Sequence, residues 1–217
     1  MIDFKSMRKK EKAEYIWDYY RLHIIGALAA ILIIGSLVYS QVTKIDYVFN
    51  LTMIGNEIDE SKITDLEKQI SSLVIKEGEK RKQAIVDIMP SDGSNNVSGL
   101  SSQYMQKFIA ETSAGEIDVV VLDKSMLETL AKHDEFSRLD NIAQLDLAAI
   151  KDEKIEAYGR DNNKAVYAVN AESIKILKDM GFDTRNKVIA IMNSSKQKDK
   201  AALVLKRLLI NKGDDIK

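Results

Sequence analysis

The sequence predicts an α/β protein in which one N-terminal transmembrane helix precedes a three-layer αβα domain with a mostly parallel sheet. The first observation behind this prediction is that residues 22–43 carry no charged side chain apart from a titratable His23. The second is that, beyond this stretch, short β-branched runs alternate with segments whose apolar residues recur every three or four positions. We therefore divide the chain into a basic, aromatic juxtamembrane segment (1–21), a transmembrane helix (22–43) and an extracytoplasmic α/β domain (44–217).

The apolar stretch is long enough to cross a bilayer as a helix. An α-helix rises about 1.5 Å per residue, so residues 22–43 cover the roughly 30 Å of the hydrocarbon core. A cleaved secretory signal is the alternative, because Val38, Tyr39 and Ser40 form a weak cleavage site. The apolar run 24–39 is, however, slightly longer than the about 7–15 residues that are usual in signal peptides. The sequence therefore favours a retained signal anchor.

The charges that flank the span predict its orientation. Basic residues gather before it: Lys5, Arg8, Lys9, Lys10, Lys12 and Arg21. After it, Lys44 stands before an acidic stretch that includes Asp46, Glu57, Asp59 and Glu60. By the positive-inside rule, the N-terminus lies in the cytoplasm and residues 44–217 lie outside the cell. We expect a single-pass protein of the cell membrane.

Aromatic and small residues mark further features of the span. Residues expected at the membrane interface are Tyr15, Trp17, Tyr19 and Tyr20 on the inner side and Tyr39 on the outer side. These rings serve either as anchors alone or as a docking surface for another membrane protein. Gly26 and Ala30 form a small-xxx-small pair, which is the spacing that lets two helices approach closely.

Segments rich in β-branched and aromatic residues predict the strands of the exterior domain. The run 117–123 (IDVVVLD) is almost continuously apolar, which is typical of a strand that is covered on both faces. The predicted strands are 47–55, 83–89, 117–123, 164–170 and 187–193. The polar, Gly-containing segment 90–100 predicts a loop.

Amphipathic segments between these strands predict the helices. Apolar residues from Ile63 to Val74 recur at helical spacing, and a later helix has Ser101 or Ser102 as its N-cap and Gly115 as its stop. The predicted helices are 59–80, 101–115, 124–136, 171–181 and 198–212, with helical pieces over 141–158 and a weak hinge at 159–163. Alternation of this kind implies a largely parallel sheet with helices on both faces.

Composition excludes several kinds of chemistry. The chain has no cysteine, which removes disulfides, thiolate nucleophiles and zinc–thiolate sites. Its net charge of −1 gives no indication of a nucleic-acid partner. The only histidines, His23 and His133, do not have metal-ligand spacing, and no nucleophile elbow, P-loop or dinucleotide fingerprint is present. We expect no metal, no cofactor and no enzymatic activity.

Short polar residues at the ends of the predicted strands are the candidate ligand-binding residues. Parallel α/β sheets bind ligands beyond the carboxyl ends of their strands. The residues there are Asn56, Ser91, Asp92, Asp123, Asn170, Asn193 and Ser194. The alternative interpretation is that they only cap the following helices, because Asp, Asn and Ser are the preferred N-cap residues.

Three segments of the sequence resemble known proteins. The segments 108–140 (FIAETSAGEIDVVVLDKSMLETLAKHDEFSRLD) and 188–209 (VIAIMNSSKQKDKAALVLKRLL) resemble bacterial extracellular solute-binding proteins. The segment 11–26 (EKAEYIWDYYRLHIIG) is similar to the anchor of uncharacterised single-span membrane proteins from Gram-positive bacteria. The resemblance implies a lobe of the periplasmic-binding type, outside the cell and serving a transporter.

Three functions are compatible with this sequence. The first is a membrane-anchored, non-catalytic binding or accessory module beside an integral membrane transporter or envelope protein, with the lipid bilayer and a small-molecule ligand as further partners. The second is a true solute receptor whose compact second lobe is built from residues 124–163. The third is an envelope enzyme that uses Asp92 and Asp123 as acid and base.

Overall fold

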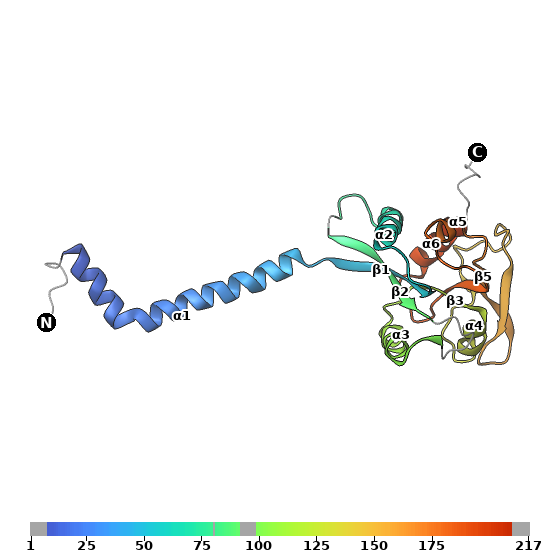
Figure 1. Cartoon of the computed structure of the whole chain (residues 1–217), viewed down its shortest axis with the longest axis horizontal. Helices are drawn as coiled ribbons and strands as arrows, with labels where there is room; N and C mark the ends of the chain where they lie inside the picture. Colours follow the sequence, from blue (N-terminus) through green and yellow to red (C-terminus); the bar gives the residue numbers. More distant parts are fainter. Residues whose placement is uncertain (1–7, 80, 92–98, 210–217) are drawn as a thin grey trace. The chain divides into compact units, whose positions relative to one another are not determined.

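A computed structural model describes residues 8–79, 81–91 and 99–209 of the chain (Figure 1). The chain divides into two compact units, one ending at Ile45 and the other beginning at Asp46. Each unit is described by itself below.

The first unit is one long helix, α1 (Lys9–Thr43). Residues Ala13–Thr43 are long and apolar enough to cross a membrane, and no part of their most apolar window is buried against the described chain. Leu22, Ile31 and Leu32 are 75 %, 65 % and 74 % exposed. A helix that is apolar on every side, and has no protein partner, is typical of a membrane span.

The residues predicted for the membrane interface and for helix packing lie on α1, and no other described part of the chain covers them. Trp17, Tyr19, Tyr20 and Tyr39 are exposed. The Tyr19 ring stacks on that of Tyr15, with ring centroids 6.0 Å apart, and also contacts the ring of Tyr20 edge-on. No described atom lies within 4 Å of a Cβ placed on Gly26, one turn before Ala30. Their roles at the interface and in packing stay predictions.

In the second unit, the described strands form one mixed six-stranded sheet. They are β1 (Asp46–Gly55), β2 (Lys82–Pro90), β3 (Val119–Asp123), β4 (Lys154–Tyr158), β5 (Lys164–Asn170) and β6 (Lys187–Ile191). Their spatial order is β2-β1-β3-β6-β5-β4. β1 is parallel to both β2 and β3, whereas the β3–β6, β6–β5 and β5–β4 pairs are antiparallel.

The short helix between β5 and β6 explains why β6 runs against its neighbours. That helix, α5 (Lys175–Asp179), has five residues and is therefore about 7.5 Å long. A helix this short does not carry the chain back along the length of the sheet. β6 therefore starts at the same end at which β5 and β3 finish, and Lys187 pairs with Asp123.

Helices cover both faces of the sheet, which confirms the predicted α/β class with three layers (Figure 1). α2 (Glu60–Val74), α5 and α6 (Lys198–Leu209) pack on one face, and α3 (Ser102–Ala114) and α4 (Lys124–Ala131) pack on the other. Alternate residues of β1 serve the two cores: Leu51 and Met53 lie with the first set, and Ile54 lies with the second. Burial of these two apolar layers is the main stabilising contribution.

Two predictions about residues 124–163 are wrong. The segment 141–158 was expected to be helical, but 154–158 is strand β4, and residues 159–163 form the turn of its hairpin with β5. Residues 124–163 also do not build a second lobe, because α4 packs on the same sheet and β4 is that sheet's edge strand. Ile155 and Ala157 face the core while Glu156 and Tyr158 face solvent, so the segment has the two-residue period of a strand.

The predicted ends of α3 are confirmed. The Ser101 hydroxyl accepts a hydrogen bond from Tyr104 N at 3.4 Å, and Gly115 ends the helix in the left-handed region with φ +68°. A Cβ on Gly115 would lie 2.8 Å from the carbonyl oxygen of Ser194. Gly115 therefore lets the end of α3 approach the segment after β6.

We expect the substitution Gly115→Ala to lower the free energy of unfolding by about 1–3 kcal/mol, because it adds a steric contact to left-handed strain. Gly181→Ala is the matched control: Gly181 also has positive φ (+85°), but no atom lies within 4 Å of its Cβ position. Urea unfolding of both variants tests this prediction. If both variants lose the same free energy of unfolding, the contact with Ser194 does not destabilise the Gly115→Ala variant.

Candidate functional site

The structure separates the residues that the sequence placed at one ligand site. Asn56, Ser91, Asp123 and Asn170 lie at the end of the sheet where β1, β2, β3 and β5 finish, here called the carboxyl end. Asn193 and Ser194 follow the antiparallel strand β6 and therefore lie at the opposite end. Asp92 lies outside the described residues.

Asn56 closes the carboxyl end of the sheet instead of facing an open crevice. Its Nδ2 donates to the carbonyl of Gly181 at 2.9 Å, and its Oδ1 accepts from the backbone N–H of Asp183 at 2.7 Å. The ring of Phe182 lies over Gly55, where an added Cβ would come within 2.6 Å of it. The loop 181–186 thus covers the end of β1.

The same loop is stiffened by a carboxylate–guanidinium fork. Arg185 donates from Nε and Nη2 to the two carboxylate oxygens of Asp183, with the shortest contact at 2.6 Å. These hydrogen bonds lower the pKa of Asp183 from its ordinary value of 3.8 to about 2. Because the folded-state pKa is depressed, the contribution to stability is complete above about pH 4 and is lost as the pH falls through about 2.

We therefore expect the carboxyl carbon of Asp183, followed by NMR, to titrate near pH 2. The Arg185→Ala variant lacks the side-chain hydrogen bonds that contribute most to the lowered pKa. The pKa of Asp183 should therefore return toward 3.8. A wild-type titration at 3.8 would contradict the fork.

Asp123 is buried in an ion pair. Lys187 Nζ donates to Asp123 Oδ2 at 2.9 Å, and the two side chains are only 7 % and 9 % exposed. Asp123 precedes α4 but makes no side-chain cap bond there. Neither the ligand-binding role nor the capping role predicted for Asp123 matches this contact, which joins β3 to β6.

The remaining polar residues of the carboxyl end have local structural contacts. Asn170 Oδ1 accepts from the backbone N–H of Glu172 at 2.7 Å, and its Nδ2 donates to Glu153 at 3.2 Å. The backbone N–H of Ser91 donates to the carbonyl of Gly55 at 2.9 Å. Asn170 thus orders the turn after β5, whereas the predicted capping role does not apply to it, because the N-cap of α5 is Ile174.

At the opposite end, Asn193 lines a small polar depression of about 280 Å³. Its Nδ2 donates to the carbonyl of Asp134 at 3.0 Å, and its Oδ1 accepts from Lys198 Nζ at 3.2 Å. Arg138, a further lining residue, is held by Asp140 at 2.9 Å. Asn193, Lys198 and Arg138 are thus already hydrogen-bonded within the protein.

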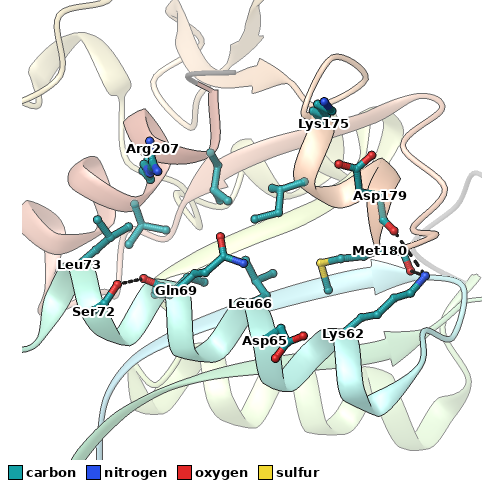
Figure 2. A pocket seen from close by; sticks show the side chains of 14 residues that line it. Lys62, Asp65, Leu66, Gln69, Ser72, Leu73, Lys175, Asp179, Met180 and Arg207 are labelled. Carbon is teal, nitrogen blue, oxygen red and sulfur yellow. Dashed lines mark hydrogen bonds between the residues drawn. The ribbon is translucent and has the colours of Figure 1, made fainter. Parts of the chain in front are cut away.

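A larger groove lies on the face covered by α2, α5 and α6. Its volume is about 450 Å³. α2 contacts α6 toward one end of the groove, and the five-residue helix α5 lies toward the other end. The groove is here called the α2–α5–α6 groove (Figure 2). Its apolar floor consists of Leu66, Ile70, Leu73, Ile176, Met180, Val204 and Leu208.

Polar side chains form the rim of this groove. At one end, Lys62 reaches across from α2 and donates to the carbonyls of Asp179 and Met180, both at 3.4 Å (Figure 2). Arg207 lies toward the other end, near Leu73. The other polar residues of the rim are Asp65, Gln69, Ser72, Lys175 and Asp179. An apolar floor with a few polar groups at the rim is typical of small-molecule sites.

Within residues 8–79, 81–91 and 99–209, no group of three or more His, Cys, Asp or Glu residues is placed to hold a metal ion. The α2–α5–α6 groove contains carboxylates, amines and a guanidinium but no histidine. The groove therefore combines an apolar surface with charged side chains, and both can contribute to ligand binding.

Comparisons with known proteins give one distant similarity. No family model matches the chain, and no curated protein matches it. Among solved structures, it is similar to an extracellular solute-binding protein family 1 chain from Alicyclobacillus acidocaldarius subsp. acidocaldarius DSM 446, with 12 % identity and a TM-score of 0.36. The match covers 58 % of this chain and 28 % of that chain. Less than a third of that protein is aligned, and nothing about its ligand transfers to this chain.

The sequence did not point to the residues of the groove. They come from three helices that are distant in sequence, and which helices share a face of the sheet depends on the strand order. The available signal was the width of the apolar stripe on α2, where Leu73 and the partly buried Ile63 extend beyond the fully buried Leu66 and Ile70.

Proposed function

We propose that this protein is a membrane-anchored extracytoplasmic binding module that holds its ligand in the α2–α5–α6 groove. It acts beside a transporter or envelope complex and has no catalytic activity of its own. The observation that carries this proposal is the groove itself, with its volume of about 450 Å³, apolar floor and polar rim. Pockets of about 300–1,000 Å³ are the usual size for small ligands.

The proposed topology rests on α1 and its flanks. The basic residues before the span keep the N-terminus in the cytoplasm and the α/β domain outside. Only Lys44 and Ile45 separate α1 from β1, and two extended residues reach about 7 Å. The domain is therefore tethered to the membrane by a short connection, and its proposed partners are lipids and integral membrane proteins.

Two alternatives are less well supported. A solute receptor of the two-lobed kind would need a second lobe, and residues 46–217 form one compact unit. An enzyme that pairs Asp92 with Asp123 would need Asp123 to exchange protons, whereas this carboxylate is committed to Lys187 in a buried ion pair. The binding module requires neither.

The stability of the domain in its native membrane tests the proposal without knowledge of the ligand. A ligand that binds only the folded state, at a concentration one hundred times its Kd, adds about 2.7 kcal/mol to the free energy of unfolding. We expect the full-length chain to resist protease better in native membrane vesicles than in vesicles of pure phosphatidylcholine. Gln69→Trp, which places an indole in the groove, should remove this difference.

Lys68→Trp is the matched control, because Lys68 is the neighbouring residue on α2, is 71 % exposed and does not line the groove. It should keep the full difference between the two kinds of vesicle. If wild type is equally stable in both, or if the two Trp variants behave alike, the groove is not the binding site.

A further inference from the structure

The two outer strands of the sheet, β2 and β4, differ in how their free edges are covered. The edge of β2 is occupied: the backbone N–H of Ala84 donates to Ser71 Oγ at 2.9 Å, and that of Val86 donates to Glu67 Oε1 at 3.0 Å. Pro90, at the end of β2, has no backbone N–H to offer. Side chains of α2 and a proline thus hinder the addition of another strand beside β2.

The backbone of β4 alternates between the sheet and the free edge. The N–H of Asn170 donates to the carbonyl of Glu153 at 2.8 Å, and the N–H of Gly159 donates to the carbonyl of Asn163 at 3.0 Å. Glu153 and Gly159 flank β4 on its two sides, and their backbone groups face β5. Because the direction of these groups alternates from one residue to the next, the even-numbered residues of β4 point theirs away from the sheet.

These residues, Lys154, Glu156 and Tyr158, make the edge of β4 open. Within the part of the chain that the structure describes, no element other than β5 hydrogen-bonds to the backbone of β4. Both charged side chains are held by the protein itself: Glu156 pairs with Lys164 on β5 at 2.6 Å, and Lys154 Nζ donates to the carbonyl of Ile150. A row of unpaired N–H and C=O groups is suited to bind another extended backbone.

We infer that this edge pairs with the same edge of a second copy of the chain. The two β4 strands run antiparallel across a twofold axis at Glu156, and the two sheets become continuous. The inference goes beyond the proposed function, because the residues of β4 do not line the α2–α5–α6 groove. Since β2 is covered, the pairing of β4 with β4 closes as a dimer and does not continue into a filament.

The sequence of β4 is complementary to itself in this register. Lys154 of one copy lies opposite Tyr158 of the other, which is 52 % exposed, and an ammonium group beside a phenol ring is a favourable pair. Ile155 lies opposite Ala157, so apolar residues meet on the face that carries the second core. The axis brings the two Glu156 carboxylates together, and each has Lys164 of its own copy beside it.

Disulfide trapping of the full-length chain in phosphatidylcholine liposomes tests this inference, because the chain has no native cysteine. Residues that face each other in a hydrogen-bonded antiparallel pair have Cα atoms about 5.5 Å apart, which suits a disulfide. On oxidation, Glu156→Cys should form covalent dimers about tenfold faster than Lys68→Cys, because pairing holds the thiols together. Lys68, on α2, is 71 % exposed and reports random collision.

The register has a matched test on the same strand. Lys154→Cys alone and Tyr158→Cys alone should cross-link no faster than Lys68→Cys, whereas a mixture of these two β4 variants should form a mixed disulfide. If Glu156→Cys cross-links no faster than Lys68→Cys, the edge does not bind a second copy, and it is left to a strand of another protein or to solvent. If all variants cross-link at the same raised rate, contact through α1 explains the dimer and the pairing of β4 is wrong.

Discussion

Replacing Lys187 by Met is expected to lower the free energy of unfolding by about 3–5 kcal/mol, because it leaves the carboxylate of Asp123 buried without a partner. The two residues are paired across β3 and β6, and their side chains are 9 % and 7 % exposed. Asp123→Leu should have a similar effect, since it leaves the ammonium group unpaired. Pulse proteolysis of the full-length chain in nanodiscs over a urea series measures both losses.

The double variant Asp123→Leu, Lys187→Met should restore stability to within about 1 kcal/mol of wild type, because an apolar pair of similar volume avoids the cost of desolvating two charges. Glu156 and Lys164 provide a matched control on the same sheet: their side chains are 2.6 Å apart but about half exposed (50 % and 54 %). Lys164→Met should therefore cost less than about 1 kcal/mol. Equal losses in the two single Lys variants would contradict the buried character of the Asp123–Lys187 pair.

Two arginines in the middle of α1 are expected to prevent stable membrane insertion. Each arginine at the centre of a span raises the free energy of insertion by about 3 kcal/mol, and Leu32 and Ile33 lie near the middle of residues 22–43. The variant Leu32→Arg, Ile33→Arg should move most of the chain from the pellet to the supernatant on alkaline carbonate extraction. Within the described residues, α1 has no protein surface to pack against, and its exposed apolar side chains are those expected of a membrane span.

The control for this experiment is Gln41→Arg. Gln41 lies near the end of α1, where a long side chain reaches the membrane surface. This variant should stay in the pellet. If the double variant also stays there, α1 is held by something other than its passage through the hydrocarbon core.

Local sequence patterns correctly predicted those helices and strands in which the residues all favour the same type of secondary structure. Residues 164–170 (KAVYAVN) contain two valines and a tyrosine, which favour a strand, and they form β5 as expected. Gly115 is the residue type that a left-handed helix end requires, and it ends α3. In contrast, 154–158 was missed because its five residues follow a segment rich in Leu, Ala and Asp, and the period of such a short strand is visible only once its neighbour β5 is known.

The candidate site was predicted less well, because it depends on strand direction. The expectation that all strand ends meet assumed parallel neighbours, and the antiparallel β6 places Asn193 and Ser194 at the opposite end from Asn56 and Asp123. The length of α5 contained this information, since a five-residue helix does not reverse the chain along a sheet. The groove residues could not be predicted, because they depend on which helices share a face.

Labelling of single cysteines in intact spheroplasts is the most direct test of the central claim, that the α/β domain faces the outside of the cell. The chain contains no native cysteine, so each introduced thiol reports on its own position. Lys68→Cys in α2 should react with a membrane-impermeant maleimide before lysis, and Lys10→Cys should react only after lysis. Protection of Lys68→Cys together with labelling of Lys10→Cys in intact spheroplasts would contradict the topology.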